Sequence, residues 1–213
     1  MRLGRTTTRL LTGLTATAAV LAPSAAAHAS APQGTRSLAQ VLAGGGAGFD
    51  HNPYDFDILT AAVGAVLKAK PGSPVAVLAD GGTALTAFLP TDRAFENLAR
   101  ELTGAGRLPA EKQAFGTVAG LGIDTVEGVL LYHVVPGATI NRKTAVKANG
   151  TKLTTAAGGT VTVRVTGRCL PRVTLRDADP SDRDPRVVRF DINKGNRQIA
   201  HAIDAVLRPA DLP

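Results

Sequence analysis

The stretch LLYHVVPGATI, residues 130–140, is apolar apart from one Tyr-His pair, and a Pro-Gly pair interrupts it. Upstream, Asp124-Thr125-Val126-Glu127 has the spacing of a capping box, which predicts a helix that begins there and runs into the stretch. The residue before Pro136 avoids helical angles, so the chain should be extended at Val134-Val135. We therefore expect a helix to end and a strand to begin at Tyr132-His133.

A histidine inside such an apolar run has three interpretations. It is a hydrogen-bonded core histidine, a catalytic base or metal ligand, or part of a recognition surface. A buried imidazole without partners costs about 1–3 kcal/mol, so a core histidine needs a donor or an acceptor nearby. We expect a structural role for His133, with a hydrogen bond to Thr91 or Asp92 at the start of another helix. Tyr132 and His133 also remain candidates for a recognition site.

The N-terminal half of the chain is predicted to be mainly helical. Ser37–Leu42 reads as one short helix stopped by three glycines. Asp57 is predicted to cap a second helix, whose apolar residues fall on one face. A strand is expected at Leu85–Leu89. After it, Thr91 or Asp92 can cap a helix that ends at Thr103-Gly104.

The C-terminal half is predicted to be mainly strands, because β-branched residues alternate with polar ones and turn residues separate the segments. The expected strands are Lys152–Thr155, Val161–Thr166, Arg172–Leu175, Val187–Ile192 and Gln198–Val206. Helices first and strands later indicate an α+β fold rather than alternating βαβ units.

Four motifs in order resemble the fasciclin domain family. They are TAFLPTDRAF (86–95), LLYHVVPG (130–137), LTTAAGGTVTV (153–163) and IAHAIDAVLRP (199–209), the last with His201 and Asp204 at the family's places. The resemblance implies a wedge of two small β-sheets with helices packed around it, over residues 57–210. It also implies a role in adhesion, in which the domain binds other proteins or matrix polymers.

The N-terminus has the pattern of a secretory signal peptide, residues 1–29. Three arginines precede the apolar stretch Leu10–Leu21, and Ala27-His28-Ala29 is a cleavage pattern. We expect a secreted, extracellular or cell-wall-associated protein with no membrane span. Removing 29 of the 213 residues leaves 184, enough for one domain behind an extension at residues 30–56.

The charge of the chain is moderately basic. Lysine and arginine number 24 against 17 acidic residues, a net charge of +7, which falls to about +4 without the signal peptide. The charges are interspersed and aromatic residues are scarce, so nucleic acid is not an expected partner. We expect a monomer whose partner is an extracellular protein or a cell-wall or matrix polymer.

Metal and cofactor sites are not expected. Asp50, Asn52, Asp55 and Asp57 are the oxygen ligands that calcium prefers, but Asx turns and a helix cap explain their spacing better. The acidic run at 177–182 lacks the calcium-loop glycine and reads as part of a solvated, charged loop at 177–189. His201 is expected to bond backbone groups, and a metal shared with His133 would need further ligands. The lone Cys169 is expected to be half-buried and inert.

The sequence contains neither a G-x-S-x-G elbow nor a phosphate-binding or dinucleotide fingerprint. We therefore expect a non-enzymatic adhesion or matrix-binding module without cofactor. A carrier for a small apolar or aromatic ligand and a hydrolase of cell-wall polymer remain the alternatives. A deep apolar pocket would favour the carrier, and a cleft with two facing carboxylates would favour the hydrolase. A flat exposed face with neither would favour adhesion.

Overall fold

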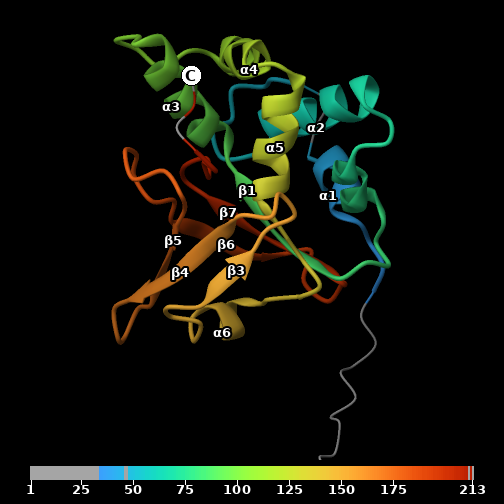
Figure 1. Cartoon of the computed structure of the whole chain (residues 1–213), viewed down its shortest axis with the longest axis vertical. Helices are drawn as coiled ribbons and strands as arrows, with labels where there is room; N and C mark the ends of the chain where they lie inside the picture. Colours follow the sequence, from blue (N-terminus) through green and yellow to red (C-terminus); the bar gives the residue numbers. More distant parts are fainter. Residues whose placement is uncertain (1–33, 46–47, 211, 213) are drawn as a thin grey trace, which may run out of the picture. The chain divides into compact units, whose positions relative to one another are not determined.

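The computed structural model describes residues 34–45, 48–210 and 212, which belong to the compact unit 32–213. The predicted signal peptide, residues 1–29, lies outside the described residues. The α+β fold is confirmed, because Figure 1 shows helices gathered above two small sheets. Within the described ranges, no single helix is long and apolar enough to cross a membrane.

The helices largely follow the predicted pattern, with α4 and α6 as additions that the sequence reading did not identify. The short helix α1 is capped by Ser37, whose Oγ accepts a hydrogen bond from Gln40 N at 3.2 Å. Helix α3 ends at Gly104, which has the left-handed backbone expected of such a stop (φ 64°). The bounds are α1 (Leu38–Ala43), α2 (Asp57–Ala69), the 3-10 helix η1 (Pro74–Ala79), α3 (Asp92–Thr103), α4 (Glu111–Gly120), α5 (Ile123–Tyr132) and α6 (Arg142–Ala145).

The strands form two sheets, with strand orders β2-β1-β7-β6 and β3-β4-β5. The last strand ends at Ile203, three residues earlier than predicted, because Asp204 turns away and bonds Arg186. The bounds are β1 (Leu85–Pro90), β2 (Val134–Pro136), β3 (Lys152–Thr154), β4 (Thr160–Thr166), β5 (Arg172–Arg176), β6 (Val187–Ile192) and β7 (Gln198–Ile203).

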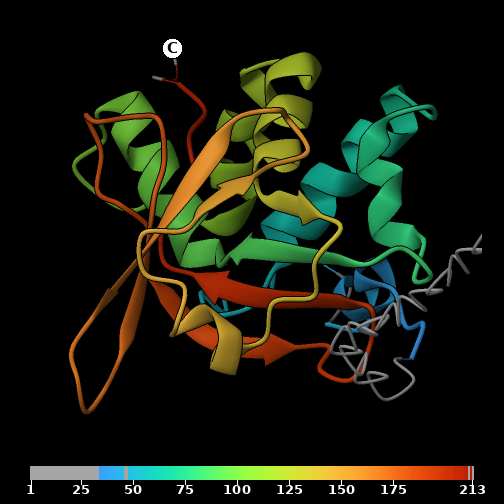
Figure 2. The same ribbon diagram turned by 60° about the horizontal axis from the view of Figure 1, so that its bottom comes forward.

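The central strands β1 and β7 run parallel and are buried along their whole length. Parallel neighbours of this kind are covered on both faces. Side chains alternate between the faces, so Ala87 and Leu89 pack on the helices while Phe88 packs toward the other sheet. The four-stranded sheet therefore packs against the helices on one face and against the sheet β3-β4-β5 on the other, and Figure 2 shows its strands β1, β7 and β6 side by side. The core is therefore divided into two clusters, one on each face of the β1-β7 pair.

The N-terminal extension is attached to this core by backbone hydrogen bonds. Gly34 N donates to Gly195 O at 2.8 Å, and Leu38 N donates to the buried Gln198 Oε1 at 2.7 Å. The amide of Gln198 donates in turn to Val77 O at 2.7 Å. Gln198 thus joins the extension, η1 and the start of β7.

Two predicted helix caps are wrong. In one, Asp92 caps the helix in place of Asp57, and in the other, Lys70 pairs with the acidic side chains expected to form the capping box. Asp57 is the first residue of α2 rather than its N-cap, which is Phe56. Helix α5 begins at Ile123 after Gly122, so no capping box forms. Its Asp124 instead pairs with Lys70 at the end of α2, at 2.7 Å, and Glu127 pairs with the same lysine.

Candidate functional site

Tyr132 and His133 lie at the junction between α5 and β2, as predicted. Both are buried, with exposed fractions of 1% and 4%. They therefore present almost no surface to a partner, and their contacts are with other parts of the fold.

His133 bridges two backbone groups. Its Nδ1 donates to Val129 O at 2.7 Å, and its Nε2 accepts from Leu207 N at 2.9 Å. The predicted bond to Thr91 or Asp92 is wrong, because both ring nitrogens are already used. Val129 O can accept from the ring because His133 N donates its hydrogen bond to Leu130 O instead, as is common in the last turn of a helix. Burial lowers the pKa of His133 to about 4, so the ring is neutral at pH 7.

Tyr132 connects α5 to the three-stranded sheet. Its hydroxyl donates to Thr160 O at 2.9 Å, and its ring packs in the cluster between the sheets. Gly159 lies against the ring, since a Cβ at that position would be 2.8 Å from Tyr132 Cε2. The Tyr-His pair thus links α5 to β4 on one side and to Leu207 on the other.

Asp92 caps a neighbouring helix rather than its own. Its carboxylate accepts hydrogen bonds from Asp57 N at 3.0 Å and Ile58 N at 2.9 Å, at the start of α2. Thr91 occupies the N-cap position of α3, but its side chain makes no capping bond. Burial, and then a hydrogen bond with Asp55, raise the pKa of Asp92 to about 8.

His201 lies in the middle of the four-stranded sheet and bonds backbone groups on both sides. Its Nε2 donates to Ile140 O at 2.8 Å, and its Nδ1 accepts from Asp191 N at 3.1 Å. Burial lowers the pKa of His201 as well. Asp204, just after β7, accepts from Arg186 N at 2.7 Å and from Arg183 Nη1 at 3.0 Å. The six predicted site residues therefore stabilise contacts between different elements and do not form one site.

The acidic run at 177–182 folds inward, contrary to the prediction of a solvated loop. Arg208 is buried, and its guanidinium lies 3.2 Å from Asp182 Oδ2 and 3.6 Å from Asp179 Oδ2. Asp177 Oδ2 accepts from Arg208 N at 2.8 Å. A buried guanidinium needs counter-charges, which explains why the carboxylates turn toward it. Burial raises the pKa of both Asp177 and Asp182 to about 6.

Cys169 is exposed, so the prediction of a half-buried thiol is also wrong. It lies in the connection between β4 and β5, next to Leu170, which is 80% exposed. Gly167 begins this connection with a left-handed backbone (φ 83°), which directs the loop away from the sheet.

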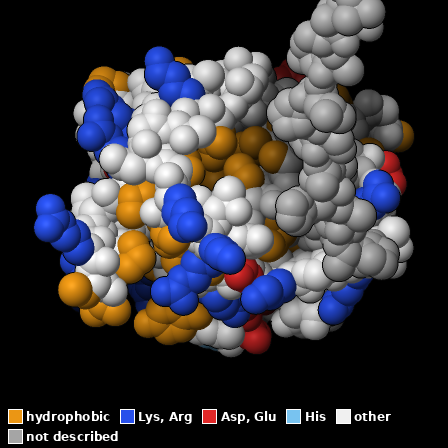
Figure 3. All heavy atoms as spheres, turned by 90° about the horizontal axis from the view of Figure 1, so that it is seen from below, with side chains coloured by type: hydrophobic (Ala, Val, Ile, Leu, Met, Phe, Trp, Pro, Cys, Tyr) orange, Lys and Arg blue, Asp and Glu red, His pale blue; other side chains and the backbone are white. Residues whose placement is uncertain are grey.

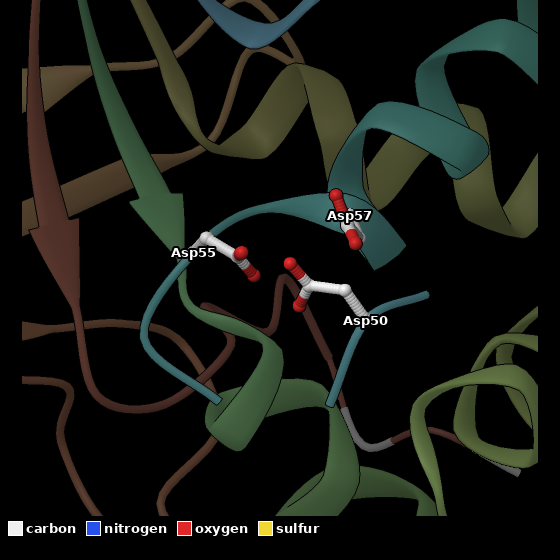
Figure 4. Close-up of side chains that lie close together, drawn as sticks. All are labelled: Asp50, Asp55 and Asp57. Carbon is white, nitrogen blue, oxygen red and sulfur yellow. The ribbon is translucent and has the colours of Figure 1, made fainter. Parts of the chain in front are cut away.

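Two groups of carboxylates have metal-ligand spacing among the described residues, and Asp57 belongs to both. Oxygens of Asp50, Asp55 and Asp57 lie within 4.8 Å of one another, as do oxygens of Asp57, Asp92 and Glu111. Figure 4 shows the first three side chains pointing toward one another. The predicted Asx turns are present, since Asn52 N donates to Asp50 Oδ1 at 2.8 Å. Glu111 was not identified from the sequence.

The outer face of the sheet β3-β4-β5 is the second feature that the sequence reading missed. Alternate residues of β4 and β5 are buried, and the residues between them are threonine or arginine. The register places Thr162 beside Arg176, Arg164 beside Thr174, and Thr166 beside Arg172. The signal was the strict alternation in TVTVRVT, which fixes both the buried and the outward side chains.

Basic side chains are common on a second face as well. Figure 3 shows Lys and Arg side chains spread over the face seen from below Figure 1, with few acidic ones among them. Arg142 lies over the ring of Phe190, 5.4 Å from its centroid. A polyanion would therefore meet little repulsion if it extended around the molecule.

The comparisons with known proteins identify a family for the chain. The family model described as "Fasciclin domain" matches residues 60–209. A solved structure of a FAS1 domain pair from the insect cell adhesion molecule fasciclin I is similar, with 17% identity and a TM-score of 0.45. The match covers 69% of this chain and 44% of that one, so the present chain spans less than half of the solved pair. A search of curated proteins found no match.

Proposed function

The chain belongs to the fasciclin domain family, and from this premise we propose that it is a secreted, non-enzymatic adhesion module that binds an anionic cell-wall or matrix polymer. The binding surface that we assign is the basic face, defined as the outward residues of β3, β4 and β5. They are Lys152, Thr154, Thr160, Thr162, Arg164, Thr166, Arg172, Thr174 and Arg176.

The single observation that carries the proposal is the charge of this face. Strands β3, β4 and β5 contain three arginines and one lysine and no acidic residue. Arg164, Arg172 and Arg176 are exposed, and none forms an ion pair with another described residue. Their guanidinium groups are thus available for phosphate, sulfate or carboxylate groups.

The shape of the basic face suits an extended polymer. Arg172 and Arg176 are four residues apart on one strand, which is roughly 13 Å. Arg164 lies opposite Thr174, midway between them, on a neighbouring strand that is about 5 Å away. Threonine hydroxyls between the arginines can donate to or accept from sugar and phosphate oxygens. One exposed ion pair contributes only about 0.2–1 kcal/mol, so the affinity must come from several pairs formed together along the polymer.

Most carboxylates of the acidic loop beside this face are directed elsewhere, and Asp184 lines a shared hollow with Arg164 and Arg176 without a described ion pair. Asp177, Asp179 and Asp182 are directed at the buried Arg208, as described above. Arg183 and Arg186 are held by Asp204. The three arginines and Lys152 therefore remain the available cations among the described residues of this sheet.

The apolar cavity between the sheets counts against the carrier alternative. The apolar cavity between the sheets, lined by Phe88, Val163 and His201 among others, has a volume of about 20 Å³. A drug-sized ligand needs a pocket of roughly 300 Å³ or more. The facing carboxylates around Asp57 are mostly buried rather than placed along an open cleft.

The experiment compares binding of the mature protein and two variants to an immobilised polyanion, heparin, and to a purified cell-wall fraction. The test variant is Arg164→Gln/Arg172→Gln/Arg176→Gln. The control variant, Lys68→Gln/Arg100→Gln/Arg107→Gln, removes the same number of exposed positive charges from the helical side. We expect tenfold or greater loss of affinity in the test variant, about 1.4 kcal/mol, and a small change in the control. Equal loss in both variants would show only non-specific attraction and would contradict the assigned face.

A further inference from the structure

The carboxylates around Asp57 lie where three helices begin. Asp57 is the first residue of α2, Asp92 of α3 and Glu111 of α4. All three are buried, and oxygens of the three lie within 4.8 Å of one another. The loop that precedes α2 adds Asp50, which is exposed, and Asp55. These five side chains, which we call the acidic cluster, join the N-terminal extension to the helices.

Some oxygens of the acidic cluster lack a partner among the described residues although they are out of contact with solvent. They are Asp57 Oδ2 and Glu111 Oε1. The side chains of Asp57 and Glu111 are 8% and 1% exposed. Buried polar atoms are almost always satisfied, so unpartnered carboxylate oxygens aimed at one another indicate a missing positive ligand.

The charges of the protein itself do not balance the acidic cluster. Five carboxylates meet three helix N-termini, each equivalent to roughly +0.5 charge, so about +1.5 opposes −5. None of the five forms an ion pair with a described lysine or arginine, and the nearby Arg93 pairs with Glu96 at 3.1 Å instead. Repulsion from Asp55, Asp50 and Glu111 adds to burial in raising the pKa of Asp57. A proton on Asp92 offsets one charge and leaves the rest.

We propose that the acidic cluster binds a calcium ion, held by Asp50, Asp55 and Asp57, with Glu111 adjoining the site through its closeness to Asp57. Calcium takes oxygen ligands at about 2.3–2.6 Å, so two oxygens on opposite sides of the ion lie about 4.8 Å apart. The spacing within each group fits that limit. Asp92 uses both of its oxygens to cap α2 and supports the site from below.

The exposure of Asp50 gives the ion a route from solvent and leaves room for water ligands. Calcium is favoured over magnesium, because magnesium demands a near-ideal octahedron at about 2.0–2.1 Å and retains most of its water. Bound calcium would fix the 48–57 loop against the start of α4. Glu111 Oε2 already accepts from His51 N in this loop at 3.0 Å.

The test is calorimetric titration of the chelator-treated mature protein with CaCl2, together with thermal melts. Extracellular calcium modules bind with a Kd of about 10⁻⁴–10⁻³ M, so about 10 mM CaCl2 should saturate the site. We expect one calcium ion per chain and a rise in Tm of about 3 °C or more. Asp57→Asn and Glu111→Gln should remove the rise and, in chelator, melt at or above the wild-type Tm because repulsion is relieved.

The matched control is Asp184→Asn in the other acidic loop, which should keep the full calcium response. Asp50→Asn, at an exposed position, should weaken calcium binding tenfold or more without lowering Tm in chelator, so it tests the site even if the buried variants fail to fold. The absence of a calcium-dependent Tm rise, an equal rise in Asp57→Asn, or an equal response to MgCl2 would overturn the proposal. None of these residues belongs to the basic face, so the two proposals fail independently.

Discussion

Replacing His133 by alanine should destabilise the fold through two orphaned backbone groups. The ring now satisfies Val129 O and Leu207 N, both through short hydrogen bonds. An unsatisfied buried group costs about 1–3 kcal/mol, and the space left by the ring adds a cavity term, so we expect a loss of about 3–5 kcal/mol. For a domain of this size the corresponding fall in Tm is about 6–20 °C.

The assay is thermal unfolding followed by circular dichroism for the wild type, His133→Ala and His133→Phe. Phenylalanine fills most of the space but makes neither hydrogen bond, so it separates the cavity from the lost bonds. His51→Asn is the control, because His51 is exposed and asparagine tolerates its left-handed backbone (φ 71°). If His133→Ala and His51→Asn both melt within a degree or two of the wild type, the structural role of His133 is refuted.

The same variants test the charge state of the ring. The pKa of His133 is about 4 in the folded state and 6.5 in the unfolded chain, so the unfolded chain binds more protons between these values. This contribution to stability is complete above pH 6.5 and is lost as the pH falls toward 4, by about 3 kcal/mol. The Tm difference between the wild type and His133→Phe should therefore narrow from pH 7 to pH 4.5. A constant difference would contradict the neutral buried imidazole.

Three further predictions concern other parts of the fold. In chelator, Asp92→Asn should gain stability relative to the wild type as the pH rises from 4 to 8. Because the pKa of Asp92 is raised, its contribution to stability is complete below pH 3.8 and is lost as the pH passes 8. A Tm difference between Asp92→Asn and the wild type that is the same at pH 5 and pH 9 would contradict this. Gly159→Ala should cost about 1–3 kcal/mol because its Cβ meets the Tyr132 ring, whereas Gly106→Ala, in open space, should be nearly neutral in chemical denaturation. Cys169 should react fully with a maleimide under native conditions, and slow labelling that needs denaturant would show that the thiol is covered.

The elements of the fold were largely predictable because local pattern dictates them. The alternation in residues 160–166 and the Pro136 restriction in residues 130–140 correctly predicted the strands and the helix-to-strand junction. Helix α4 was not identified, although its buried Ala114 and Val118 lie four residues apart on one face. Its apolar face is short and consists of small side chains, and the glycines around it are typical of a loop.

The partners of buried polar groups could not be predicted, because they depend on which distant segments meet. Asp57 looks like a helix cap in sequence, but Asp92, which is 35 residues away, caps α2. The ring of His133 bonds a residue that is 74 positions further along the chain. Asp179 and Asp182 look solvated until the buried Arg208 is placed beside them.

The basic face and the acidic cluster were likewise predictable only where they depend on local sequence. The alternation of threonine and arginine in β4 was readable from the sequence, but the presence of Arg172 and Arg176 beside it depends on the register of β5. The acidic cluster draws on the 48–57 loop, α3 and α4, and only its first part is contiguous in sequence. Glu111 in particular had no local signal, since an acidic residue at the start of a helix is common.

The central claim is that the Tyr-His junction builds the fold while the basic face binds the polymer. The most direct measurement is the polyanion affinity of Arg164→Gln/Arg172→Gln/Arg176→Gln and of His133→Phe, well below the Tm of each protein. The account predicts that the arginine variant loses binding with an unchanged Tm. It also predicts that His133→Phe, though less stable, binds like the wild type while it is folded. Loss of binding in folded His133→Phe, with normal binding in the arginine variant, would contradict the account.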